Sequence, residues 1–310
     1  MDWLKEPSDE RPADTMKSGR STPNLTDSNA DPSKSMVRNF QLLDMLPELD
    51  PDDQLAVFER VIRSPRPQVR QRALGLGAAI LSDSRLLKYL HEDDDVRRNA
   101  AVEMLKLRRR RSLELACALL SDEESDVVVQ AIQVLAHLRD RQAVEPLARV
   151  LEHDDPNVVQ EAILALARIG DVRGLPAILP HLKGIPWVQA AALEAVGRLG
   201  SSEHVGEIEP LLADPDLEPL VIEALAKIGG ITALRALARH WMEHGEQFEP
   251  AFVLRRLAEV IEGLTCTPPE IDGLEEALRR TVDDRVKEVR LAASRCLASL
   301  RGKSRSLWMF

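Results

Sequence analysis

The sequence of 310 residues has few aromatic side chains and no long uninterrupted apolar run. Aromatic residues account for 3% of the chain, although hydrophobic residues make up 44%. Ala and Leu carry most of this apolar content, and both have high helix propensity. Small and unbranched side chains of this kind favour thin helical layers over a thick mixed core.

Cysteine is scarce and scattered, with Cys117, Cys266 and Cys296 far apart in the sequence. This pattern excludes a disulfide framework and a clustered metal site, and it favours a reducing cytoplasm. No stretch reaches the roughly 20 apolar residues that a membrane-spanning helix needs, so we expect no membrane insertion. The first ten residues are acidic and mixed, unlike a signal peptide, which predicts a soluble, unprocessed chain.

Positive charge is in deficit, because 41 Lys and Arg stand against 51 Asp and Glu, for a formal net charge of -10. Non-specific binding to nucleic acid requires many basic side chains that neutralise phosphates, so we expect no nucleic-acid partner. The sequence shows no Ser/His/Asp or Cys/His constellation and no glycine-rich phosphate loop. We therefore predict no catalytic residues, no cofactor and no metal.

The sequence does contain an internal repeat. Apolar residues recur at offsets 0, +4, +8 and +11 in eight successive segments, and on a helix these offsets fall within about 80° of one another. The residue at +4 is Ala in six of the eight segments, which suits close helix packing. The residues at offset 0 are Val69, Val96, Val127, Val158, Val188, Leu217, Val253 and Val289.

A shorter amphipathic stretch precedes each of these segments, as in residues 143–151 and 175–182. Turn signals such as Asp154-Asp155-Pro156 separate the two stretches, because Asp caps a helix and Pro opens the next one. Gly170 follows the second stretch and is typical of a helix end. A unit of two helices cannot bury its apolar stripe alone, so the units must stack.

The segment Asp155-Pro156-Asn157-Val158, followed by residues 162–171 (AILALARIGD), resembles the HEAT-repeat family, and within it the bacterial phycobilisome-lyase HEAT-like type. The resemblance covers roughly residues 52–302. It implies an all-α fold, a right-handed α-α superhelix (α-solenoid) of about eight HEAT-like helical hairpins.

Different compositions flank the repeats. Residues 1–35 are rich in Ser, Pro, Asp, Asn and Thr, which predicts a disordered N-terminal tail. Residues 36–51 have the pattern of an amphipathic capping helix, and residues 303–310 form a basic and apolar C-terminal tail. The four apolar residues Leu307-Trp308-Met309-Phe310 are costly to leave in water, so they either fold back on the last repeat or act as a docking peptide.

The resemblance implies a non-catalytic scaffold or adaptor that binds proteins, with an enzyme or enzyme subunit related to phycobilin lyases as the alternative. Deoxyhypusine hydroxylase, which resembles this chain in fold, binds iron through repeated His-Glu dipeptides, whereas this sequence has one, His91-Glu92. One pair cannot assemble a di-iron site. His240 and His244 have the spacing of a helical zinc site, but no third ligand is evident near them.

Basic residues recur at offset +10 in five consecutive repeats. They are Lys106, His137, Arg168, Arg198 and Lys227. Equivalent positions of a solenoid line up, so we predict a ladder of positive groups on the inner surface that binds an acidic segment of a protein partner. The alternative is local: Glu194 and Glu223 precede Arg198 and Lys227 by four residues, which favours ion pairs within each helix, and cations also complement helix C-termini.

The run Arg108-Arg109-Arg110-Arg111 offers a second basic feature. Such a run can hold a phosphate or an acidic partner. Acidic residues including Glu103 and Glu114 lie close in sequence, so we expect a solvated and locally paired loop instead. Trp187 and Trp241 are either interface anchors or packing residues, and the longer spacing near Trp241 favours packing there.

Overall fold

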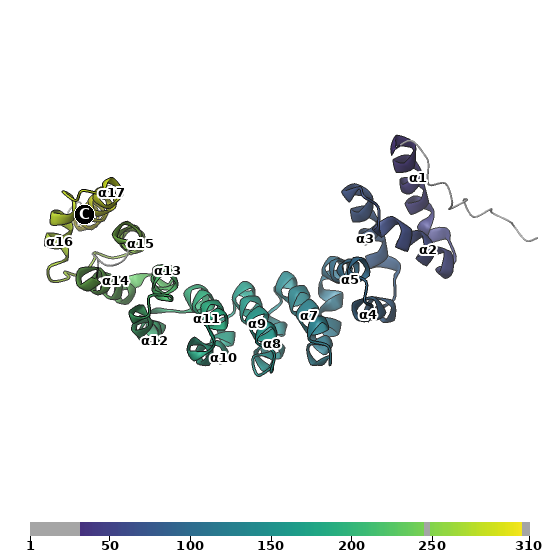
Figure 1. Ribbon diagram of the computed structural model, residues 1–310, viewed down its shortest axis with the longest axis horizontal. Helices are drawn as coiled ribbons and strands as arrows, with labels where there is room; N and C mark the ends of the chain where they lie inside the picture. The colour runs from purple at the N-terminus through teal and green to yellow at the C-terminus, as the bar shows by residue number, and fades with distance from the viewer. Residues whose placement is uncertain (1–31, 245–248, 306–310) are drawn as a thin grey trace, which may run out of the picture.

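The computed structural model describes residues 32–244 and 249–305, and every regular element in these ranges is an α-helix or a 3-10 helix. The helices stack side by side into a long curved array (Figure 1). The predicted fold class, an all-α solenoid, is thereby confirmed. The predicted tail up to residue 31 and the apolar segment Leu307–Phe310 lie outside the described residues.

Eight helical hairpins make up the array, and each contains a first and a second helix. The first helices are α2 (Pro51–Ile62), α4 (Asp83–His91), α6 (Leu113–Ala118), α8 (Val144–Val150), α10 (Leu175–Ile178), α12 (Val205–Ile208), α14 (Gly230–His244) and α16 (Leu274–Thr281). The second helices are α3 (Pro67–Ile80), α5 (Asp95–Arg108), α7 (Ser125–Leu138), α9 (Pro156–Ile169), α11 (Pro186–Leu199), α13 (Glu218–Ile228), α15 (Pro250–Gly263) and α17 (Lys287–Arg305). We number the hairpins as repeats one to eight in this order.

Short 3-10 turns adjoin the N-terminal helix α1 (Pro32–Met45) and several first helices. They are η1 (Leu46–Glu48), η2 (Arg109–Ser112), η3 (Leu119–Ser121), η4 (Arg141–Ala143), η5 (Val172–Gly174), η6 (Leu179–Lys183), η7 (Ser202–His204) and η8 (Glu209–Ala213). Proline follows the first residue of η1, η6 and η8, so the α-helical hydrogen bond that its N–H would make is absent there. The first helices of repeats five and six are therefore one α-turn between two 3-10 turns.

Local signals in the sequence set the helix ends. The Asp155 side chain accepts a hydrogen bond from the backbone N–H of Asn157 at 2.9 Å, and Pro156 then opens α9. Gly170, at φ +79°, ends the same helix in the left-handed conformation, which glycine adopts without steric cost. The predicted order of helix, turn, helix and glycine is therefore present in repeat four.

The repeated apolar stripe forms the core. Seven of the eight residues at offset 0 are buried, and Val96 is the exception at 38% exposure. Val96 lines an open cavity of about 530 Å³ with Ile62 and Leu74, so its neighbours do not close over it. The stripe correctly identified the buried face of each second helix, apart from this junction of repeats one and two.

The second helices α9, α11 and α13 lie on the inner side of the curve, and the first helices α8, α10 and α12 lie on its outer side (Figure 1). Helix α11 packs against both α9 and α13. A Cβ added to Gly197 of α11 would lie 2.9 Å from Cα of Ala224 in α13. Small residues are therefore needed where the inner helices approach one another.

The ends of the array differ from the predicted boundaries. Helix α1 (Pro32–Met45) begins four residues before the predicted start at residue 36, because proline is well accepted in the first turn of a helix. It packs against α2 and α3 and buries Leu42 and Leu43. At the other end, α17 continues to Arg305, beyond the predicted end of the repeats at residue 302.

The last repeat contains a deeply buried thiol. Cys296 of α17 donates its S–H to the backbone carbonyl of Leu254 at 3.0 Å. Burial raises the pKa of this thiol to about 12, so it stays protonated and behaves as a small core side chain.

None of the described helices is long and apolar enough to cross a membrane.

The close approach of α11 and α13 gives a direct test of the packing. We expect Gly197→Ala to destabilise the protein by about 1–3 kcal/mol, because the new methyl group meets backbone rather than a mobile side chain. Gly206→Ala is the matched control, since a Cβ at Gly206 meets nothing within 4 Å. Thermal unfolding should show a lower midpoint for the first variant and an unchanged or higher midpoint for the control. Equal midpoints would contradict the packing described here.

Candidate functional site

The five residues of the predicted ladder all lie near the C-terminal ends of inner helices. Lys106 lies in α5, His137 in α7, Arg168 in α9, Arg198 in α11 and Lys227 in α13. Four of them are exposed, and Lys106 is half-buried. The structure therefore brings them to equivalent positions of successive repeats, as the period predicts.

Ion pairs divide the ladder. Arg198 pairs with Glu194 at 2.9 Å, and Lys227 pairs with Glu223 at 3.5 Å, each within its own helix. Lys106 pairs with Glu103 at 2.8 Å, a contact three residues apart that the sequence analysis missed. These three cations are neutralised locally, so they do not form a continuous positive strip.

His137 and Arg168 differ from the other three, because neither side chain forms an ion pair or hydrogen bond with any residue in the described ranges. They occupy neighbouring repeats three and four. The uncompensated part of the ladder is thus confined to the centre of the array.

The arginine run separates into one structural residue and three free ones. Arg108 donates from Nε to the carbonyl of Ala78 at 2.8 Å, and its other nitrogens bond Leu81 and Asp83. It therefore joins the end of α5 to the connection between repeats one and two.

The other three arginines, Arg109 to Arg111, are exposed and contact no acidic partner among the residues that the structure describes. The expectation of a locally paired loop is wrong for them, and two of the nearby acids are engaged elsewhere. Glu103 pairs with Lys106, and Asp122 bonds His91 at 3.0 Å. Three guanidinium groups consequently remain uncompensated in η2.

A cavity of about 410 Å³ lies between the C-terminal ends of α5 and α7, and we call it the basic pocket. Its lining residues are Lys106, Arg109, Arg110, His137, Leu138 and Asp140. It combines two residues of the ladder with two of the arginine run, which the sequence analysis treated as separate features. Asp140 accepts a hydrogen bond from the backbone N–H of Gln142 at 3.0 Å and caps η4.

Two arginines next to this pocket have unusual backbone conformations. Within the described ranges, Arg109 (φ 54°) and Arg139 (φ 51°) are the non-glycine residues with positive φ. They follow α5 and α7, whereas Gly170 and Gly229 follow α9 and α13 at φ 79° and 66°. Arg139, at ψ 32°, is in the left-handed region, whereas Arg109 combines its positive φ with ψ -129°, a conformation that residues with a Cβ rarely adopt.

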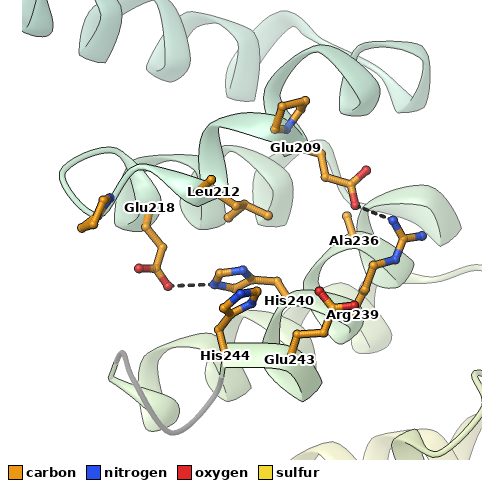
Figure 2. A pocket seen from close by; sticks show the side chains of 11 residues that line it. Glu209, Leu212, Glu218, Ala236, Arg239, His240, Glu243 and His244 are labelled. Atoms are coloured by element: carbon orange, nitrogen blue, oxygen red, sulfur yellow. Dashed lines mark hydrogen bonds and ion pairs between the residues drawn. The ribbon is translucent and has the colours of Figure 1, made fainter.

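A second cavity, of about 610 Å³, lies between repeats six and seven and contains the predicted histidine pair (Figure 2). His240 Nε2 and Glu218 Oε1 are 2.7 Å apart, and both side chains are buried. The His244 ring stacks on His240 with the ring centroids 5.2 Å apart. Arg239 pairs with Glu209 at 3.1 Å on the opposite side of the cavity.

This histidine pair has the contacts of a structural hydrogen bond rather than of a ligand set. No group of three or more His, Cys, Asp or Glu side chains in the described ranges is placed to hold a metal ion.

The two residues of the His91-Glu92 dipeptide also form hydrogen bonds with other protein groups. His91 bonds the carbonyl of Leu87 at 2.9 Å and Asp122 at 3.0 Å, and these bonds raise its pKa above the ordinary value.

The two tryptophans have different environments. Trp241 is buried in the helix α14, in agreement with the packing interpretation. Trp187 is 49% exposed at the start of α11. Cys117 is half-buried, and burial raises the pKa of its thiol, which suits a core role rather than a nucleophile.

The histidine cavity gives a second test. We expect His240→Ala to cost about 2 kcal/mol of stability, because the Glu218 carboxylate stays buried without its donor. The matched control is His244→Ala on the next turn of the same helix, where the exposed ring should contribute within about 0.5 kcal/mol. Thermal unfolding of both variants measures the difference. Equal losses would contradict a structural role for the His240–Glu218 bond.

Comparison with known proteins supports the repeat assignment for the centre of the chain. Residues 112–185 match the family model for HEAT repeats. A comparison with curated protein sequences found no match.

Several solved structures resemble this chain at low sequence identity. An engineered protein from a structural genomics consortium is 20% identical with a TM-score of 0.41, covering 71% of this chain and 96% of its own. Human deoxyhypusine hydroxylase in complex with glycerol is 17% identical with a TM-score of 0.32, covering 88% and 100%. A designed armadillo repeat protein is 17% identical with a TM-score of 0.33, covering 78% and 98%. The chain is thus an α-solenoid of stacked hairpins whose residues 112–185 are similar to HEAT repeats.

Proposed function

We propose that this chain is a non-catalytic scaffold or adaptor that binds a protein partner along its inner surface, the exposed faces of the second helices α5, α7, α9, α11 and α13. The observation that carries the proposal is the exposure of large apolar side chains on two neighbouring inner helices. Trp187 begins α11 at 49% exposure, and Leu220 lies in α13 at 39%. Exposed tryptophan is enriched among the residues that dominate binding energy.

The charges of the inner surface support a mixed partner rather than a uniform polyanion. Arg168 is exposed without an acidic partner among the described residues, so it is available to an acidic side chain. Glu223 pairs with Lys227 of its own helix and also with Arg256 of α15 at 2.8 Å. A partner segment that bears scattered acidic residues and an apolar anchor fits this surface better than a nucleic acid does.

The proposal includes a cytoplasmic location, which the three free cysteines favour. It also includes the absence of a cofactor. The bacterial phycobilisome-lyase subtype stays a prediction, as does the lyase alternative. A stoichiometric visible chromophore in the purified protein would contradict the non-catalytic proposal.

A crosslinking experiment tests where the partner binds. A photoreactive amino acid replaces Trp187 on the inner surface in one variant, and replaces Val172 in another as the matched control. Val172 is also highly exposed, at 63%, but it begins η5 ahead of the outer helix α10. We expect a discrete crosslinked protein in cells from position 187 and none from position 172. Crosslinking from position 172 alone would contradict binding at the inner surface.

A further inference from the structure

The basic pocket contains more positive charge than its surroundings neutralise. Glu103 compensates Lys106 at 2.8 Å, and the lining residue Asp140 caps η4. Arg109 and Arg110 of the lining, and Arg111 beside them, have no acidic partner in the described ranges. The three exposed guanidinium groups are therefore available to an anion from outside the molecule.

Helix dipoles account for only part of this surplus. The C-termini of α5 and α7 each present the equivalent of about half a negative charge, and cations near them are favourable. The last carbonyls are also partly satisfied, because Arg109 N–H bonds Lys106 O and Arg139 N–H bonds Leu135 O. Two half-charges cannot neutralise three arginines. A lysine in the last turn would also complement the helix dipole, and it would do so without a strained backbone.

Backbone strain is a second and independent observation. Arg109 has φ 54° directly after α5, whereas glycine follows α9 and α13 with positive φ. Glycine would relieve this conformation at no steric cost. A strained residue that persists where glycine would be more stable points to a role for its side chain, and here that side chain lines the basic pocket.

From this geometry we propose that the basic pocket binds the phosphate of a phosphorylated serine or threonine on the protein partner. The inference rests on the proposed function, and it names the chemistry of one contact. Guanidinium groups donate paired hydrogen bonds to phosphate oxygens. A phosphoserine carries nearly two negative charges and three acceptor oxygens at neutral pH, and so matches several converging cations better than a single carboxylate does.

The surroundings of the pocket favour a protein segment over a nucleic acid. Asp95 and Asp126 are exposed at the opposite ends of α5 and α7, and Glu103 is exposed between them. A nucleic acid needs a row of phosphate contacts, and Asp126, like the paired Asp95 and Glu103, offers it none. A protein segment with one phosphate needs only the pocket for that contact. From there it can continue toward Arg168 and Trp187 on the inner surface.

The test uses the full chain and a mixture of peptides in which randomised residues flank one phosphoserine. Binding is measured at about 0.15 M salt, so that long-range charge effects are screened. Matched mixtures carry serine or glutamate in place of phosphoserine, and a short single-stranded RNA represents the other class of phosphate ligand. We expect the phosphoserine mixture to bind about tenfold tighter than the glutamate mixture, the difference that one added charged hydrogen bond supplies.

Two glycine variants make the test specific. Arg109→Gly removes a lining charge and relieves the backbone, so we expect about tenfold weaker phosphopeptide binding with an unchanged or raised thermal midpoint. Arg139→Gly is the matched control, because it also replaces an arginine with positive φ, there in the left-handed region, but Arg139 does not line the pocket. It should change binding by less than about twofold.

Equal effects of the two variants, equal binding of the glutamate mixture, or tighter binding of the RNA would each overturn the proposal. Failure of the phosphate proposal is distinct from failure of the proposed function. Crosslinking at position 187 identifies the partner. Phosphatase treatment of that partner in its free form, before it is mixed with the chain, should weaken its binding. If binding survives that treatment unchanged, the partner uses the inner surface without the basic pocket.

Discussion

The whole array depends on the close approach of second helices in neighbouring repeats. Helix α10 has four residues and α12 has four, far fewer than an isolated helix needs to be stable in water. Such elements persist because they pack against longer neighbours, as α10 does against α11. Gly197 of α11 opposite Ala224 of α13 shows how little space the inner helices leave between them. Each hairpin is therefore stable only through the adjacent ones.

This constraint also governs where charge accumulates. Stacking at a regular spacing places equivalent residues next to one another, so a repeated cation would repel its neighbours without compensation. On most of the inner surface, an acidic residue of the same helix neutralises the cation, as the pairs of Arg198 with Glu194 and of Lys227 with Glu223 illustrate. The junction of repeats two and three does not, because Arg109 to Arg111 have no such partner among the described residues. That junction therefore leaves three exposed arginines available to an external anion.

The sequence was sufficient for the helices and insufficient for the contacts between them. The period of apolar residues identified all eight second helices, because burial on one face is encoded at each residue separately. The exposure of Val96 was not predictable, since it depends on how two neighbouring repeats fit together. The His240–Glu218 bond joins residues 22 positions apart in different repeats, and no local spacing indicates it.

For the candidate site too, the sequence predicted positions along the helices but not the contacts between them. The offset of +10 correctly placed His137 and Arg168 on equivalent turns of the inner helices. The sequence did not show that Lys106 pairs with Glu103, nor that Arg109 and Arg110 turn toward the same cavity as His137. Arg109 also has a positive φ, which no sequence rule assigns to arginine. A comparison of cap residues would still have signalled it, because arginine occupies there the place that glycine takes after α9 and α13.

Hydrogen exchange of the free protein, followed by mass spectrometry, tests the central claim most directly. If each hairpin is stable only through its neighbours, the amides of α9 and α11 should exchange most slowly, because both flanking repeats protect them. Exchange should then accelerate through α15 to α17 at the open end of the array. A single slow rate shared by α9, α11 and α17 would contradict the account, because it would show one cooperative core rather than a chain of mutually dependent repeats.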